Sequence, residues 1–300
     1  MTSHIENTPT IVCFGEILWD LLPTGALPGG APMNVAYHLH TLGLNPQLIT
    51  RLGSDERGDE LMSILHGLQV DTSHVQVDLA IPTGVVNATP DANGDMKYEF
   101  ADLAAWDHIT VIPSLLKLVE ESAYFIYGSL VARREDSRAA LIELLGHAKE
   151  KILDINLRAP HYTRDTLETL MEQADLLKMN EEELELISSW YGQAGDMQGQ
   201  VNLVREKFGI RSVLVTRGAN GAMVCYKDEW ASHSGFKVQV ADTVGSGDSF
   251  LAGFLYSVIN GKGVQDALAF ACQLGSFVAT KKGAWPEYTM SSLQQDGAVL

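Results

Sequence analysis

The chain has 300 residues, 46% of them hydrophobic, which suits one globular domain spanning 1–300 with at most a small appendage. No apolar run approaches the roughly 20 residues of a membrane-spanning helix, and the polar N-terminus lacks a signal-peptide core. The formal net charge of −17 argues against nucleic acid or an anionic membrane as a partner. The composition therefore predicts a cytoplasmic protein, and Cys13, Cys225 and Cys272 are expected to be reduced core residues.

Short apolar runs alternate with amphipathic stretches nearly throughout the chain. The expected strands are Ile11–Phe14, Gln47–Leu52, Ala123–Tyr127, Lys151–Ile155, Asp175–Met179 and Ser212–Thr216. The expected helices are Val35–Leu42, Glu60–Leu68, Arg138–Ala148, Glu181–Ile187 and Asn202–Phe208. This alternation indicates an α/β fold whose mostly parallel sheet is covered by helices on both faces.

The glycine pair Gly29-Gly30 lies between two polar residues, Asp20 and Asn34, on the carboxyl side of the first expected strand. Ligands of open α/β sheets bind at that edge. Aspartate accepts hydroxyl groups, asparagine both donates and accepts, and glycine lets the backbone approach a ligand closely. The pattern suggests a site for a small polyol, although a turn followed by a helix cap at Asn34 explains the same residues.

One segment breaks the alternation of strands and helices. Thr83–Phe100 contains two alternating runs around Asn93-Gly94, a strong signal for a β-hairpin. We expect this hairpin, near 83–101, to form a small β-sheet lid with the segment near 16–28; an ordinary surface hairpin is the alternative. Tyr98 and Phe100 lie on its apolar face and could cover a ligand ring.

Polar residues end two expected strands in the middle of the chain. Arg158 could hold a phosphate or sugar oxygen. Asn180 and Glu183 lie three residues apart at a helix start, where their side chains meet, and they suit a hydrated Mg²⁺. The preference of acidic residues for helix N-termini explains the glutamate equally well.

Further along the chain, Thr216, Gly218 and Gly221 lie between two strands. Their spacing would permit a turn that contacts phosphate, with the threonine as a hydroxyl donor. A hairpin turn at Asn220-Gly221 explains the glycines equally well.

The most informative stretch is Asp242–Phe254, where Gly245, Ser246 and Gly247 lead into Asp248 and an apolar helical pattern. The glycines let backbone amides turn inward where a helix begins, which makes an anion site. A carboxylate there fits a base that removes a hydroxyl proton as a phosphoryl group arrives, as in a kinase. Helix capping by Asp248 is the alternative.

These motifs together resemble the ribokinase/pfkB family of carbohydrate kinases, in the family's order and over essentially the whole chain. Asp242–Phe254 resembles the family motif Asp-Thr-x-Gly-Ala-Gly-Asp-x-Phe, with Ser246 where alanine is common. The resemblance implies a ribokinase-like three-layer α/β/α fold with a β lid, Asp248 as the base, and the amides of Gly245–Asp248 as the anion hole. Trp19–Pro23 and Ala104–Asp107 look most like bacterial fructokinases.

The resemblance also implies ATP as the phosphoryl donor, with Thr216, Gly218 and Gly221 beside the nucleotide. Asn180 and Glu183 would hold Mg²⁺ through water. Family members often bind K⁺ beside the anion hole, and the matching positions are the Asp242 side chain and the carbonyls of Val244, Val278, Lys281 and Gly283.

The activity expected from this resemblance is transfer of the γ-phosphoryl group of MgATP to the 6-hydroxyl of D-fructose. Another sugar kinase of the family, for ribose, 2-keto-3-deoxygluconate or a nucleoside, is the alternative. A non-catalytic sugar sensor is a third possibility, but a sensor would not need Asp248. Two copies could associate as a homodimer through the lid.

Overall fold

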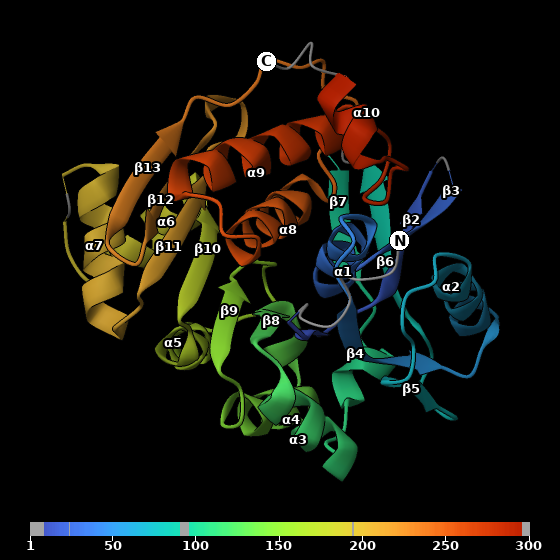
Figure 1. The fold of residues 1–300 in the computed structure, drawn as a ribbon. Helices are drawn as coiled ribbons and strands as arrows, with labels where there is room; N and C mark the ends of the chain where they lie inside the picture. Colours follow the sequence, from blue (N-terminus) through green and yellow to red (C-terminus); the bar gives the residue numbers. More distant parts are fainter. Residues whose placement is uncertain (1–8, 24, 91–95, 194, 296–300) are drawn as a thin grey trace.

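The computed structural model describes residues 9–23, 25–90, 96–193 and 195–295, and most of its strands join one large sheet (Figure 1). Strand β12 pairs antiparallel with both of its neighbours, β11 and β13, and all other neighbours in this sheet pair in parallel. From edge to edge the strands are β13 (Glu229–His233), β12 (Ala222–Tyr226), β11 (Ser212–Thr216), β10 (Leu176–Asn180), β9 (Glu150–Asp154), β8 (Tyr124–Gly128), β1 (Ile11–Phe14), β4 (Pro46–Gly53) and β5 (Val75–Asp78).

Helices cover both faces of this sheet, so each strand is buried on two sides. In β1, Ile11 and Cys13 join one hydrophobic cluster, while Val12 and Phe14 join the other. This is why the strand is apolar at every position instead of alternating. The first cluster also holds α1 (Ala31–Thr41), α2 (Glu56–Gly67), α8 (Ser246–Ile259) and α9 (Val264–Ala279). The second holds α3 (Pro113–Glu121), α4 (Glu135–Leu145), α5 (Arg164–Gln173), α6 (Glu181–Ser189) and α7 (Met197–Phe208).

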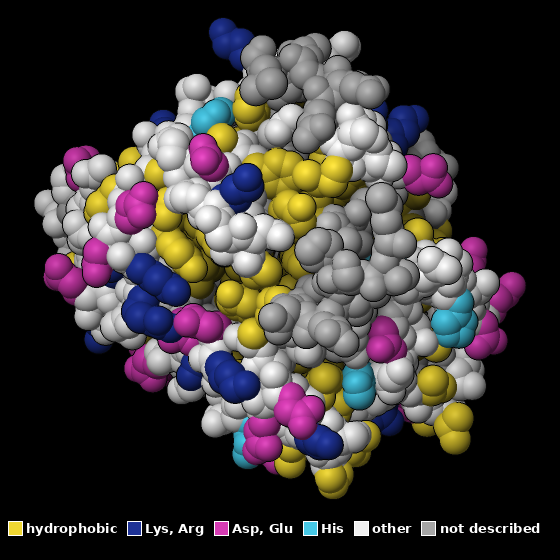
Figure 2. Space-filling model, in the orientation of Figure 1, with side chains coloured by type: hydrophobic (Ala, Val, Ile, Leu, Met, Phe, Trp, Pro, Cys, Tyr) yellow, Lys and Arg dark blue, Asp and Glu magenta, His cyan; other side chains and the backbone are white. Residues whose placement is uncertain are grey.

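The three-layer α/β/α arrangement predicted from the sequence is therefore confirmed. A short last helix, α10 (Met290–Gln295), packs through Leu293 beside Leu274, Phe277 and Val278 of α9. Hydrophobic side chains gather in the middle of the face in Figure 2, where Figure 1 places α8 and α9. All three cysteines are free and buried, as predicted. Within the described ranges no helix is long and apolar enough to cross a membrane.

Every predicted strand and helix is present, but four helices begin earlier than expected. Helix α4 starts at Glu135 with two acidic residues in its first turn. Helix α1 starts at Ala31 with proline in its first turn, α2 starts after an Asp55 cap, and α7 starts after an Asp196 cap. First turns carry proline and polar capping residues instead of apolar ones. A search for apolar periodicity therefore finds a helix only from its second turn onward.

The predicted small sheet is also present. Its strand order is β3 (Gly25–Gly29), β2 (Leu18–Leu22), β6 (Gly84–Pro90) and β7 (Met96–Phe100). Strand β6 pairs antiparallel with β7, as a hairpin requires, and parallel with β2. The Asn93-Gly94 turn lies outside the described residues.

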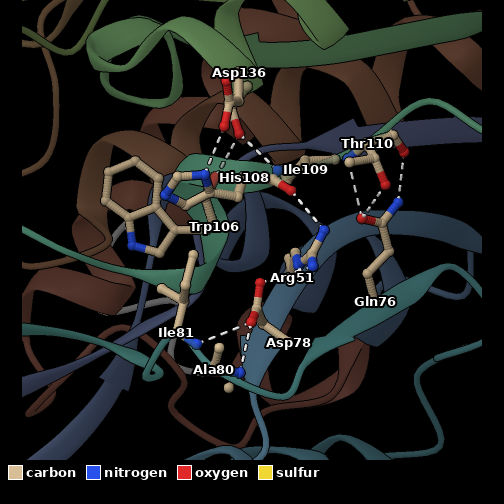
Figure 3. A network of polar contacts seen from close by, with 12 residues as sticks. Arg51, Gln76, Asp78, Ala80, Ile81, Trp106, His108, Ile109, Thr110 and Asp136 are labelled. Atoms are coloured by element: carbon tan, nitrogen blue, oxygen red, sulfur yellow. Dashed lines mark hydrogen bonds and ion pairs between the residues drawn. The ribbon is translucent and has the colours of Figure 1, made fainter.

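A polar network holds the chain where it leaves the large sheet for the small one (Figure 3). Arg51 Nη2 lies 2.7 Å from Asp78 Oδ2, and Asp78 Oδ1 accepts the amides of Ala80 and Ile81 at 2.8 Å. Arg51 Nη1 also donates to the carbonyl of His108 at 2.8 Å. These bonds fix the path of the chain just before β6.

A buried ion pair holds the chain where it returns from the small sheet. Arg133 donates from Nε to Asp107 Oδ1 at 2.8 Å and from Nη2 to Oδ2 at 2.6 Å. Its Nη2 also donates to the carbonyl of Ala101 at 2.8 Å, directly after β7. The guanidinium lies 4.2 Å from the centre of the Trp106 ring. Trp106 and Asp107, which look like a fructokinase motif in the sequence, thus help to anchor the small sheet.

Candidate active site

A glycine turn leads into α8 and leaves its first amides without a cap from any described side chain. Gly245, the N-cap residue, has φ of 74°, a left-handed conformation that glycine adopts without strain. A Cβ at this position would lie 2.5 Å from the Cβ of Ala284. Because the first amides of a helix carry partial positive charge, this turn can receive an anion.

Asp248 lies in the first turn of α8 and is only 8% exposed. Its Oδ2 accepts a hydrogen bond from Asn34 Nδ2 at 2.7 Å. Burial raises the pKa of Asp248, and the charge of Lys178 and the Asn34 hydrogen bond oppose this rise. A carboxylate with a raised pKa beside an anion site is suited to accept a proton.

Two buried charged residues that the sequence analysis did not select lie beside the glycine turn. Lys178 Nζ lies 2.8 and 3.0 Å from the two carboxylate oxygens of Asp154. A Cβ at Gly247 would lie 2.9 Å from the same Nζ, so the ammonium group lies against the turn. Burial acts to lower the pKa of Lys178, but the nearby carboxylates, Asp154 first, raise it. The sequence did contain a signal for this pair, because Lys178 and Asp154 are charged residues within apolar runs. Their two strands, β10 and β9, are neighbours in the sheet.

Asp20, on β2, belongs to the same group of charges. Its pKa is raised to about 6, chiefly by burial and also by the carboxylates of Asp242 and Asp248, while the charge of Arg158 acts to lower it. Its carboxylate packs directly over the backbone of Gly29, where any side chain would collide with it. The charges of Arg158 and Asp248 thus both act on Asp20, and the binding of a small polyol by these residues stays a prediction.

Gly30 lets the chain turn from the small sheet into α1. Its φ is 113°, and a side chain here would collide with the carbonyl of Glu16. Glu16, also unselected by the sequence analysis, is buried, and its Oε1 accepts the amide of Ala31 at 3.3 Å. Burial raises the pKa of Glu16 to about 7. This junction places Asn34, one turn later, beside Asp248.

Thr216, Gly218 and Gly221 line a pocket of about 340 Å³. The same pocket reaches Ser246 and Gly247 of the glycine turn at the start of α8. The hairpin interpretation is confirmed, because these residues connect the antiparallel strands β11 and β12, and contact of this turn with phosphate stays a prediction. Most of the remaining wall is apolar or small and includes Phe236, Val238, Val240, Phe250, Cys272 and Ala279. The pocket thus combines an apolar region with an anion site. Asn180 is not among its lining residues.

Asn180 and Glu183 do meet, but they do so in a capping box at the start of α6. Asn180 Oδ1 accepts the amide of Glu183 at 2.8 Å, and Glu183 Oε2 accepts the amide of Asn180 at 2.8 Å. Glu183 Oε1 accepts the amide of Leu157 at 2.7 Å. Among the described residues no cluster of three or more His, Cys, Asp or Glu side chains could hold a metal. Both carboxylate oxygens of Glu183 thus accept backbone amides, and contact of this pair with Mg²⁺ through water stays a prediction.

The Asp242 side chain is hydrogen-bonded to two loops near the glycine turn at the start of α8. Its Oδ1 accepts the amide of Val244 at 3.1 Å, and its Oδ2 accepts the amide of Gly283 at 3.0 Å. The carbonyl of Val278 accepts the amide of Lys281 at 2.9 Å. Carboxylate and carbonyl oxygens are the donors that hard cations prefer, and K⁺ binding by these residues stays a prediction.

Phe100 and Tyr98 are the two aromatic residues predicted to cover a ligand ring, and the structure describes the side chain of Phe100. Phe100 packs against one face of the core, with its ring 5.2 Å from the ring of His161. The backbone of Tyr98 pairs with Ala88 in the small sheet, but its side chain lies outside the described part of the chain.

The overall architecture is that of ribokinase-like kinases. A fructokinase from Xylella fastidiosa with bound ATP superposes with a TM-score of 0.83 at 24% identity, covering 96% of this chain and 99% of that chain. A fructokinase from Vibrio cholerae O395, bound to fructose, ADP and a calcium ion, gives a TM-score of 0.82 at 24% identity, covering 96% and 98%. At these identities the likeness establishes the fold.

The sequence establishes the family. A family model described as pfkB family carbohydrate kinase matches residues 23–288, so the chain belongs to the pfkB family of carbohydrate kinases. It is 31% identical over 312 residues to probable fructokinase-6, chloroplastic, from Arabidopsis thaliana, covering 94% of this chain and 80% of that protein. It is 30% identical over 305 residues to fructokinase-1 of Oryza sativa subsp. japonica, covering 92% and 93%. The chain is therefore a fructokinase-like carbohydrate kinase.

Proposed function

We propose that this kinase transfers the γ-phosphoryl group of MgATP to the 6-hydroxyl of D-fructose. The observation that carries the proposal is the position of the glycine turn at the start of α8. Ser246 and Gly247 line the pocket proposed for ATP, whereas Asp248 contacts Asn34 and lies near Asp20. The turn thus separates a nucleotide pocket from a polar site for a sugar. Several curated relatives named as fructokinases support fructose as the sugar.

In this proposal each residue has one task. Asp20, Asn34 and Arg158 bind the sugar hydroxyls, with Gly29 and Gly30 allowing close approach. Asp248 removes the proton of the attacking hydroxyl, and the amides of Gly245–Asp248 stabilise the charge on the arriving phosphoryl group. When bound, Mg²⁺ neutralises phosphate charge, and Asn180 and Glu183 would hold it through water.

We also propose that residues 1–300 act as one kinase domain and that the small sheet, from segments near 16–28 and 83–101, closes over the sugar. A lid is expected because water in the site would hydrolyse ATP instead. Its anchoring at both ends by Arg51–Asp78 and Arg133–Asp107 supports this role. A homodimer formed through this sheet stays a prediction.

The substrate is tested by measuring ADP release with MgATP across a panel of sugars. Fructose should give the highest kcat/KM, because the polar group around Asp20 is expected to hold the hydroxyls of a ketohexose. Ribose, 2-keto-3-deoxygluconate and a nucleoside are the comparison substrates. A clear preference for one of these would overturn fructose but keep the kinase. No stimulation by any sugar would favour the sensor.

Exchanging Na⁺ for K⁺ should raise kcat. A cation held by the Asp242 carboxylate and the carbonyls of Val244, Val278, Lys281 and Gly283 would fix the loops beside the anion turn. The measurement is the rate of ADP release at constant ionic strength in the two salts. Asp242→Asn should lose most of the difference. Equal rates in both salts for the unmodified enzyme would contradict a K⁺ site.

A further inference from the structure

The segment Ala284–Tyr288, which follows α9, is hydrogen-bonded to α1 near Asp248. Tyr37 OH donates to the carbonyl of Pro286 at 2.8 Å. The two ring nitrogens of His38 contact Tyr288 OH at 2.9 Å and the carbonyl of Ala284 at 3.0 Å. This segment, Ala284–Tyr288, therefore has a fixed position relative to α1.

Trp285 lies within this segment and reaches the asparagine that contacts the base. Its ring stacks on Tyr37, with centroids 5.6 Å apart and an interplanar angle of 11°. Its Nε1 donates to Asn34 Oδ1 at 2.7 Å, and Asn34 Nδ2 in turn donates to Asp248 Oδ2 at 2.7 Å. The indole, the amide and the carboxylate thus form a continuous hydrogen-bonded chain.

The donor and acceptor in each of these two hydrogen bonds follow from the chemistry of Trp285 and Asp248. An indole N–H can only donate a hydrogen bond, and an ionised carboxylate can only accept one. The amide of Asn34 must therefore turn its oxygen to Trp285 and its nitrogen to Asp248. If the indole N–H were absent, the amide could rotate by half a turn. Its oxygen would then face the carboxylate and favour the protonated acid.

We propose that Trp285 is a positioning residue for the phosphoryl transfer: by fixing the orientation of the Asn34 amide, it keeps the Asp248 carboxylate ionised and directed toward the sugar hydroxyl. This inference rests on the proposed function, in which Asp248 is the base. Trp285 itself contacts neither the carboxylate nor, in this proposal, the substrate.

The effect on acidity follows from the groups around Asp248. Besides Asn34, the charged groups whose fields reach this carboxylate are Lys178, Arg158, Asp154, Asp20 and Glu16. None of these is altered by a change at Trp285. Burial raises the pKa of Asp248 and the Asn34 hydrogen bond lowers it, so losing that bond raises the pKa further. The base would then become protonated at a higher pH.

The test is the pH dependence of kcat/KM for the sugar, which reports the free enzyme. Trp285→Phe keeps a ring against Tyr37 but removes the N–H. We expect the acidic limb of the profile to move up by about one pH unit, the size expected for loss of a hydrogen bond to a charged group. At pH values above the limb, kcat/KM of the variant should lie closer to that of the unmodified enzyme than it does near the limb.

Tyr37→Phe is the matched control, because it removes the bond to Pro286 while leaving the indole bond to Asn34 intact. Its acidic limb should stay where it is in the unmodified enzyme. A Trp285→Phe limb that does not move, or an equal shift in Tyr37→Phe, would overturn the proposal. If Trp285→Phe fails to fold, benzothienylalanine at this position keeps both rings and has sulfur, which cannot donate, in place of the N–H.

A double-mutant cycle with Asn34→Ala tests whether the effect passes through the amide. In the Asn34→Ala background, Trp285→Phe should cause no further shift of the limb, and a shift of equal size there would contradict the mechanism. The proposed kinase function and the proposed role of Trp285 are contradicted by different results. If the unmodified enzyme shows no sugar-stimulated ADP release, the proposed function is wrong, whereas an active enzyme with an unmoved limb refutes only the role of Trp285.

Discussion

Replacing Asp248 by asparagine should lower kcat by roughly 10² to 10⁴, the range expected for loss of a general base. Asparagine has the size of aspartate and can still accept the hydrogen bond from Asn34, but it cannot take a proton at neutral pH. Sugar and ATP binding should therefore change much less than kcat. The measurement is steady-state ADP release together with sugar affinity from calorimetry.

The pH profile makes this test sharper. Because burial raises the pKa of Asp248, the rate of the unmodified enzyme should fall as the pH drops through that pKa, and the variant should lack this limb. Asp266→Asn is the matched control, since Asp266 is also an aspartate in the first turn of a neighbouring helix but is exposed. Near-normal turnover in Asp248→Asn would exclude Asp248 as the base.

Replacing Asp107 by asparagine should lower the free energy of unfolding by about 3–5 kcal/mol, the cost of leaving a buried charge without its partner. The side chains of Arg133 and Asp107 are only 3% and 1% exposed, so water cannot replace the lost carboxylate. The measurement is equilibrium unfolding in denaturant.

Asp136→Asn, in the network of Figure 3, is the control for this second prediction. Asp136 pairs with His108 at 2.7 Å but is 61% exposed, so its loss should cost under about 1 kcal/mol. The double replacement Asp107→Leu with Arg133→Met should cost less than Asp107→Asn, because it removes both charges. If Asp107→Asn were no worse than Asp136→Asn, the pair would not anchor the return from the small sheet.

Local sequence patterns predict the strands, the helices and the glycine turn because each of these depends on neighbouring residues. Asn34 and Asp248 are 214 positions apart, yet both could be selected because each stands beside glycines at the start of a helix. Trp285 has no such local signal. Its importance comes from a contact with Asn34 across 251 positions, which no periodicity or spacing encodes.

Glu183 shows the opposite limit of sequence reasoning. The spacing of Asn180 and Glu183 correctly brings the two side chains together, but the pattern of a capping box is the same as that expected for a hydrated metal. Only the structure shows that both carboxylate oxygens of Glu183 already accept backbone amides, from Leu157 and from Asn180. For Lys178 and Asp154, the strand register decides that two separate charges are one buried pair.

The contact between Trp285 and α1 has a consequence for how the protein is made. Ribosomes synthesise the chain from its N-terminus, so α1 leaves the ribosome long before Trp285, which is encoded near the 3′ end of the mRNA. Asn34 meets Asp248 and Trp285 only after almost the whole chain has been synthesised. A nascent or truncated chain that stops before residue 285 would contain every motif of the family and still lack the group that sets the Asn34 amide.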